Sequence, residues 1–132
     1  MKKILIIEDE PDARTLLARR LAAYRFDVVE AQDAPSGIQK AKEMKPDLIV
    51  LDLRLPGQDG IEVYRALRAD PSTESIPVLF LTALAAAGTM TEQSVELIAA
   101  AKHGVRLEGR YAVMGKPYEP RDLISAIRGL LK

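Results

Sequence analysis

The polar side chains in this sequence that could carry chemistry stand directly after short apolar runs, where each run ends. In chain order they are Glu8, Asp9, Glu10, Asp52, Thr82 and Lys116. Two like charges about 4 Å apart repel by about 4 kcal/mol at an effective dielectric of 20, so crowded carboxylates need a counter-ion. Mg²⁺ takes one or two carboxylates, several waters and a phosphate oxygen. The set is therefore suited to a magnesium-bound phosphoryl group.

An aspartate can act as the nucleophile of such a site, because its carboxylate forms an acyl phosphate. Asp52 is the best placed, since it stands alone after what should be a central strand. Lys116 would be a second cation beside the phosphoryl group, and Thr82 would be a hydroxyl donor.

The elements that position these groups follow from two alternating periodicities. Continuous apolar runs predict buried parallel strands over residues 4–7, 28–31, 48–51, 78–81 and 111–114. Helical spacing predicts helices over residues 11–24, 34–44, 61–69, 89–104 and 120–131. Strands that alternate with helices imply an α/β doubly wound sheet with right-handed crossovers, in one domain spanning residues 1–132. Ligands of such sheets bind at the carboxyl ends of the strands, where the polar groups above converge.

Composition excludes several other classes of function. The chain has 132 residues, of which 48% are hydrophobic, and its 19 basic and 19 acidic residues give zero net charge. We therefore expect no direct binding to nucleic acid or to an anionic membrane. The absence of Cys and the single His exclude disulfides, thiol catalysis and multi-histidine metal sites. No apolar run approaches a membrane span, and acidic residues interrupt the first run too early for a signal peptide, so we expect a cytoplasmic protein.

Five segments of the sequence together resemble the receiver domain of two-component response regulators. They are ILIIEDEP at residues 4–11, DLIVLDLRLPG at 47–57, DG at 59–60, IPVLFLTA at 76–83 and KPY at 116–118. The resemblance covers essentially the whole chain. It implies the flavodoxin-like, three-layer fold with five parallel strands in the order 2-1-3-4-5.

The resemblance also implies a phosphoacceptor and a metal site. Asp52 matches the residue that takes a phosphoryl group from the phosphohistidine of a sensor histidine kinase or phosphotransfer protein. Asp9 and Asp52 match the direct Mg²⁺ ligands, together with the backbone carbonyl of Arg54. Glu8 matches the acid that acts on the metal through water. A receiver promotes only its own phosphorylation and dephosphorylation, so the resemblance implies that the chain is not an enzyme with separate substrates.

Three further positions match the response to phosphorylation. Thr82 matches the switch hydroxyl that moves toward the phosphoryl group, with the backbone amide of Ala83 beside it. Lys116 matches the lysine that pairs with a phosphoryl oxygen, and the resemblance implies a cis peptide bond between Lys116 and Pro117. A downstream protein partner would read this change.

Two departures from the family pattern keep another class of function open. From Thr82 to Lys116 is 34 positions, longer than in most receivers, and Val113 occupies the position of the usual aromatic switch residue. Tyr111 lies on the same face of that strand. Both departures favour, as the alternative, a phosphorylation-independent interaction module on a receiver scaffold. An aspartate-nucleophile phosphatase is less favoured, because Arg54 stands where such enzymes carry a second acid.

Overall fold

A five-stranded parallel sheet forms the centre of the computed structural model, which describes residues 1–55, 58–82 and 109–132. The strands lie in the order β2-β1-β3-β6-β7. Their bounds are Lys3–Ile7 for β1, Asp27–Ala31 for β2, Leu48–Asp52 for β3, Val78–Thr82 for β6 and Tyr111–Gly115 for β7. The predicted strands and the order 2-1-3-4-5 are therefore confirmed.

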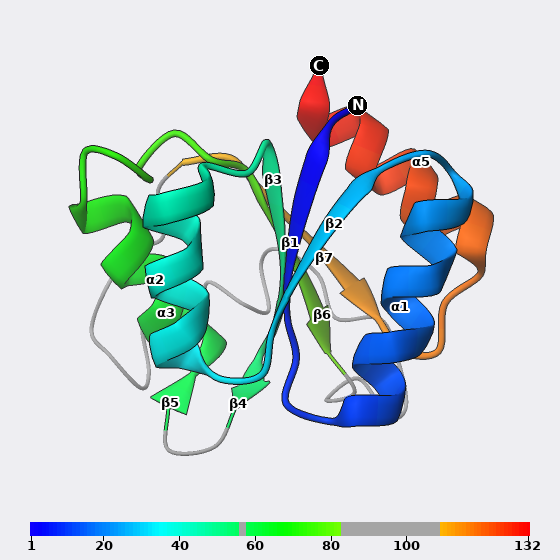
Figure 1. Ribbon diagram of the computed structural model, residues 1–132, viewed down its shortest axis with the longest axis horizontal. Helices are drawn as coiled ribbons and strands as arrows, with labels where there is room; N and C mark the ends of the chain where they lie inside the picture. The colour runs from blue at the N-terminus through cyan, green and yellow to red at the C-terminus, as the bar shows by residue number, and fades with distance from the viewer. Residues whose placement is uncertain (56–57, 83–108) are drawn as a thin grey trace.

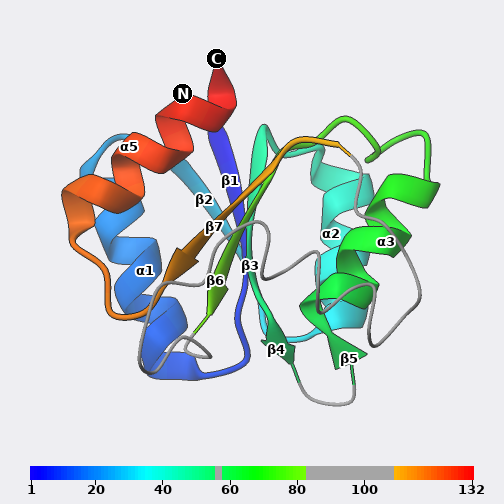
Figure 2. The same cartoon turned by 180° about the vertical axis from the view of Figure 1, so that it is seen from behind.

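Helices cover both faces of the sheet and give the three layers seen in Figures 1 and 2. Helices α1 (Pro11–Ala23) and α5 (Pro120–Leu131) lie on one face. Helices α2 (Ala34–Met44) and α3 (Gly60–Ala69) lie on the other. The helix predicted over residues 89–104 lies outside the described residues.

The continuous apolar strands contribute side chains to two separate hydrophobic cores, one on each face of the sheet. Successive side chains of a strand point to opposite faces, so a strand covered on both faces must be apolar throughout. Ile4 and Ile6 of β1 pack with buried leucines of α1 and α5, whereas Leu5 and Ile7 pack with buried residues of α2 and α3. Each fully buried aliphatic side chain contributes about 1.5–3 kcal/mol. This burial holds the strand ends in place.

A short second sheet follows β3 and was not predicted. It pairs β4 (Arg54–Leu55) with β5 (Gln58–Asp59) in antiparallel fashion. Helix α3 then begins at Gly60, one residue earlier than predicted, because the Asp59 carboxylate accepts a hydrogen bond from the Glu62 amide at 3.0 Å and caps the helix. The two-stranded β4–β5 sheet lies at the same end of the molecule as the carboxyl end of β3 (Figure 1).

An aromatic cluster lies between α3 and the strands β6 and β7. The rings of Tyr64, Phe80 and Tyr111 lie 5.4–5.8 Å apart. The Arg68 guanidinium lies 4.3 Å from the centre of the Tyr64 ring and donates to the carbonyl of Ile76 at 2.7 Å. The cluster fastens α3 to the sheet.

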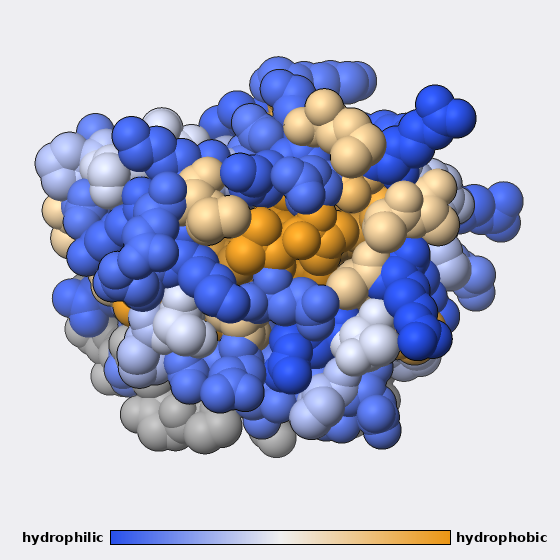
Figure 3. Space-filling model, viewed as in Figure 1, coloured by the Kyte–Doolittle hydropathy of each residue, from blue (hydrophilic) through white to orange (hydrophobic). Residues whose placement is uncertain are grey.

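The face shown in Figure 3 is mostly hydrophilic around a central apolar area. This area lies between α1 and α2, over the edge strand β2, whose Val28 and Val29 are half-buried. Both chain termini lie at the end of the sheet away from the carboxyl ends of β1 and β3 (Figure 1). No helix in the described parts of the chain is long and apolar enough to cross a bilayer.

Candidate functional site

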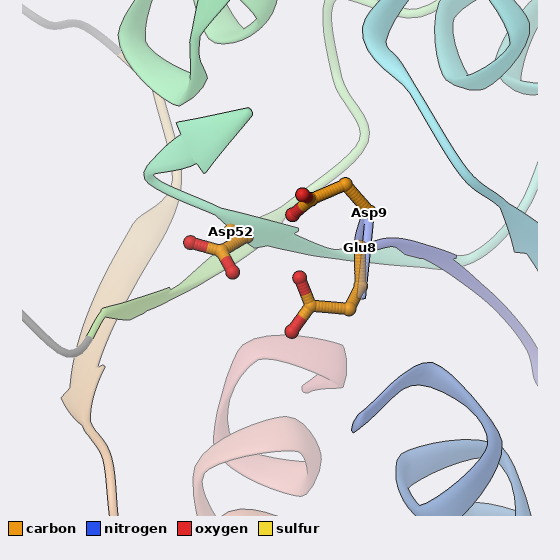
Figure 4. Close-up of side chains that lie close together, drawn as sticks. All are labelled: Glu8, Asp9 and Asp52. Atoms are coloured by element: carbon orange, nitrogen blue, oxygen red, sulfur yellow. The ribbon is translucent and has the colours of Figure 1, made fainter. Parts of the chain in front are cut away.

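Three carboxylates meet at the carboxyl ends of the central strands β1 and β3. In the register of these strands Ile7 lies opposite Leu51, so Glu8 and Asp52 continue both strands at the same level. One oxygen from each of Glu8, Asp9 and Asp52 lies within 4.8 Å of the others. Figure 4 shows the three side chains close together, two from the end of β1 and one from the end of β3. The predicted convergence of these carboxylates is therefore confirmed.

Lys116 joins the same cluster from the far end of the sequence. Its Nζ atom lies 2.9 Å from Oε1 of Glu8 and 3.1 Å from Oδ2 of Asp52, so one ammonium group bridges two carboxylates. The backbone amide of Lys116 donates to the carbonyl of Thr82 at 2.8 Å, which extends the pairing of β7 with β6 by one residue. The Lys116–Pro117 peptide bond is cis, as predicted.

Burial affects the pKa values of both Glu8 and Lys116. Burial chiefly, together with the hydrogen bond and negative charge of Asp52, raises the pKa of Glu8 to about 7, and Lys116 opposes the rise only in part. Burial also works to lower the pKa of Lys116, but its contacts with Glu8 and Asp52 outweigh burial and leave that pKa above its ordinary value. The site thus holds three acidic side chains but only one ammonium group close to them, so positive charge is in deficit. An added cation would relieve this deficit.

Glu10, the third acid of the run after β1, has a different task. Its carboxylate accepts hydrogen bonds from the backbone amides of Asp12 at 3.1 Å and Ala13 at 2.6 Å, and so caps the N-terminus of α1. Glu10 is therefore occupied at the helix end and is not a member of the carboxylate cluster. The cap fixes the direction in which the chain leaves β1.

Gly60 lets α3 pack directly on the backbone that carries Asp52. A Cβ atom added at Gly60 would lie 2.5 Å from the Asp52 carbonyl oxygen and 2.9 Å from the Cα atom of Leu53. The Gly60 amide donates to the Leu53 carbonyl at 2.8 Å. The close approach of Gly60 to Asp52 depends on three-dimensional contacts that no sequence pattern reports.

The remaining predicted residues are placed as follows. Thr82 is fully buried at the end of β6, adjacent to the end of β3. Arg54 begins β4, two residues after Asp52, and its role as a metal ligand stays a prediction. Ala83 lies outside the described residues. Tyr111 packs on Tyr64 and Phe80 at the start of β7, whereas Thr82 lies opposite Gly115 at the end of that strand, so Tyr111 is remote from the switch position.

Comparison with known proteins agrees with this architecture. The fold is that of the flavodoxin-like receiver domains: the chemotaxis protein CheY4 of Vibrio cholerae superimposes with a TM-score of 0.80 over 98% of each chain, at 22% identity. A putative response regulator from Chloroflexus aurantiacus gives a TM-score of 0.78 at 26% identity, over 98% of this chain and 97% of that one.

The family follows from sequence. The model of the response regulator receiver domain matches residues 4–128, and the chain belongs to this family. It is 37% identical over 131 residues to the alkaline phosphatase synthesis transcriptional regulatory protein PhoP of Bacillus subtilis, covering 99% of this chain and 49% of that protein. It is 32% identical to the phosphate regulon transcriptional regulatory protein PhoB of Pseudomonas aeruginosa, covering 99% and 52%. The chain thus spans about half the length of these relatives. Membership favours two-component signalling over the phosphorylation-independent module.

Proposed function

We propose that Asp52 accepts a phosphoryl group from the phosphohistidine of a sensor histidine kinase or phosphotransfer protein, in a reaction that requires Mg²⁺. One observation carries the proposal: the Asp52 carboxylate lies in a cluster with Glu8 and Asp9 and within 3.1 Å of the Lys116 ammonium. A carboxylate flanked by both metal-ligand candidates and a fixed cation is suited to receive a group that carries negative charge.

The residues of the cluster fit Mg²⁺. Carboxylate oxygens are the hard donors that this ion prefers, and Mg²⁺ commonly retains several waters. Asp9 and Asp52 would be direct ligands together with the backbone carbonyl of Arg54, and the buried Glu8 would act through a water. Asp9 is exposed, so the cluster is open to solvent on one side. When bound, the ion would neutralise charge on the phosphoryl oxygens.

The protein groups then have distinct tasks in the transfer. An Oδ atom of Asp52 attacks phosphorus and forms a P–O bond while the P–N bond of the phosphohistidine breaks. The imidazole nitrogen keeps the electron pair of that bond and takes up a proton. Lys116 already contacts Asp52 and would pair with a phosphoryl oxygen. The hydroxyl of Thr82 and the amide of Ala83 would donate to the other oxygens.

We take residues 1–132 as a single receiver domain in the cytoplasm, where it would meet its kinase and a downstream protein partner. It would promote only its own phosphorylation and dephosphorylation, with no other substrate. It would make no direct contact with nucleic acid, because the net charge of the chain is zero.

The test is the intact mass of the protein after incubation with phosphoramidate or acetyl phosphate, with and without Mg²⁺. We expect one phosphoryl adduct that needs Mg²⁺ and is absent from Asp52→Asn. Asp27→Asn is the matched control, since Asp27 is an exposed aspartate at the start of β2 and should leave the adduct intact. An equal adduct on Asp52→Asn would refute the assignment. The absence of any adduct on the parent would refute the proposed chemistry.

A further inference from the structure

A guanidinium group from α1 holds the backbone that carries Glu8 and Asp9. Nη1 of Arg14 donates to the carbonyl of Glu8 at 2.9 Å and reaches the carbonyl of Asp9 at 3.5 Å. The amide of Glu8 donates to the carbonyl of Ala31 in β2 at 3.1 Å. Both backbone polar groups of Glu8 are therefore engaged, one by the sheet and one by Arg14.

Arg14 is itself held in place by the neighbouring strand. Its Nε atom lies 3.5 Å from Oε1 of Glu30 in β2, and only 17% of the Arg14 side chain is exposed. The Glu30 side chain is 45% exposed, so this ion pair adds little stability by itself. Its effect is directional, because a planar guanidinium that pairs at Nε presents Nη1 at a fixed angle. The carbonyls of Glu8 and Asp9, in the acidic turn formed by residues 8–10, accept hydrogen bonds from that Nη1 atom.

We infer that Arg14, oriented by Glu30, is a positioning residue for the acidic cluster and acts through the backbone of Glu8 and Asp9. The inference rests on the proposed function, since the cluster matters as a cation site. Sequence analysis did not single out either residue. Partners that orient metal ligands from outside the coordination sphere typically change metal affinity about 10–100-fold when they are removed.

Charge and position make opposite predictions for one substitution. Arg14→Met removes a positive charge near a site that is to hold a cation, so charge alone would make Mg²⁺ bind more tightly. Loss of the hydrogen bonds frees the acidic turn and would weaken binding. A weaker site in Arg14→Met can therefore arise only from positioning.

The experiment is a Mg²⁺ titration of the unphosphorylated protein, with the heat of binding measured by calorimetry. We expect the Kd for Mg²⁺ to rise about tenfold in Arg14→Met. A smaller rise is expected in Arg14→Lys, because a lysine keeps the charge without the planar fork. Arg19→Met is the matched control, since Arg19 is exposed on the same helix and gives the same change in net charge. An unchanged or lower Kd in Arg14→Met would overturn the inference.

A second readout separates this inference from the proposed function. In protein without metal, hydrogen exchange of the Glu8 amide reports the order of the acidic turn, whether or not Mg²⁺ ever binds. We expect that exchange to be about tenfold faster in Arg14→Met than in the parent and in Arg19→Met. Failure of the parent to bind Mg²⁺ would count against the proposed function. Unchanged exchange at Glu8 would count against the positioning role of Arg14.

Discussion

The raised pKa of Glu8 leads to a specific pH dependence of stability in the metal-free protein. The folded protein binds the Glu8 proton more tightly than the unfolded chain does, since the pKa is about 7 in the fold and 4.5 ordinarily. This contribution to stability is fully present below pH 4.5 and is lost as the pH rises through 7. Stability due to Glu8 therefore decreases across that interval, in the direction opposite to that of a salt-bridged carboxylate with a lowered pKa.

The magnitude follows from the two pKa values. Between about pH 5 and pH 7.5 the linkage relation gives a loss of about 2 kcal/mol in the free energy of unfolding. Solvent screening reduces this value little, because the Glu8 residue is only 5% exposed. Glu8→Gln cannot bind that proton and should lack this part of the pH dependence.

The assay is urea denaturation in EDTA at both pH values. We expect the stability of the parent relative to Glu8→Gln to fall by about 2 kcal/mol from pH 5 to pH 7.5. The control Glu74→Gln changes an exposed carboxylate of the loop before β6 and should run parallel to the parent. If Glu8→Gln also runs parallel to the parent, the reasoning about burial of Glu8 is refuted.

Two further substitutions test the charge and packing of the site, and a third tests packing remote from it. Lys116→Met leaves the carboxylates of Glu8 and Asp52 without their ammonium group. Urea denaturation at pH 7.5 should show a loss of about 2 kcal/mol, below the 3–5 kcal/mol of a fully buried pair because the Lys116 side chain is 27% exposed; an unchanged stability would contradict this. Gly60→Ala forces α3 away from the Asp52 backbone and should lower both stability, by about 2 kcal/mol, and Mg²⁺ affinity; calorimetry that shows parental affinity would argue against the close approach. Arg68→Met removes hydrogen bonds to two backbone carbonyls at the far end of the sheet, so it should cost about 2 kcal/mol in urea and leave Mg²⁺ affinity unchanged.

Much of the fold was predictable because parallel strands covered on both faces leave an unmistakable pattern. A strand such as Ile4–Ile7 must be apolar at every position, and the residue after it must then lie at the sheet edge. The same reasoning brought Lys116 to Asp52 across 64 positions, since Asp52 ends β3, Lys116 follows β7, and only β6 lies between these two strands. The positions of the strand ends and the order of the strands are enough to predict that these side chains meet at the carboxyl edge of the sheet.

The parts that sequence analysis missed depend on short elements and on three-dimensional contacts. Strands of two residues, such as Arg54–Leu55, are too short for a periodicity to mark them. Glu10 is chemically equivalent to its acidic neighbours, and only the turn of the backbone directs its carboxylate to the amides of α1. Arg14 looks like any other arginine of an amphipathic helix until its contact with the Glu8 carbonyl is seen.

The central claim is that Asp52 is the residue that carries the phosphoryl group. Borohydride reduction of the protein treated with phosphoramidate and Mg²⁺ converts an aspartyl phosphate to homoserine, which peptide mapping by mass spectrometry locates directly. The account predicts homoserine at position 52 and at no other aspartate. Homoserine at position 9, or its absence from position 52 in protein that carries the adduct, would contradict the account.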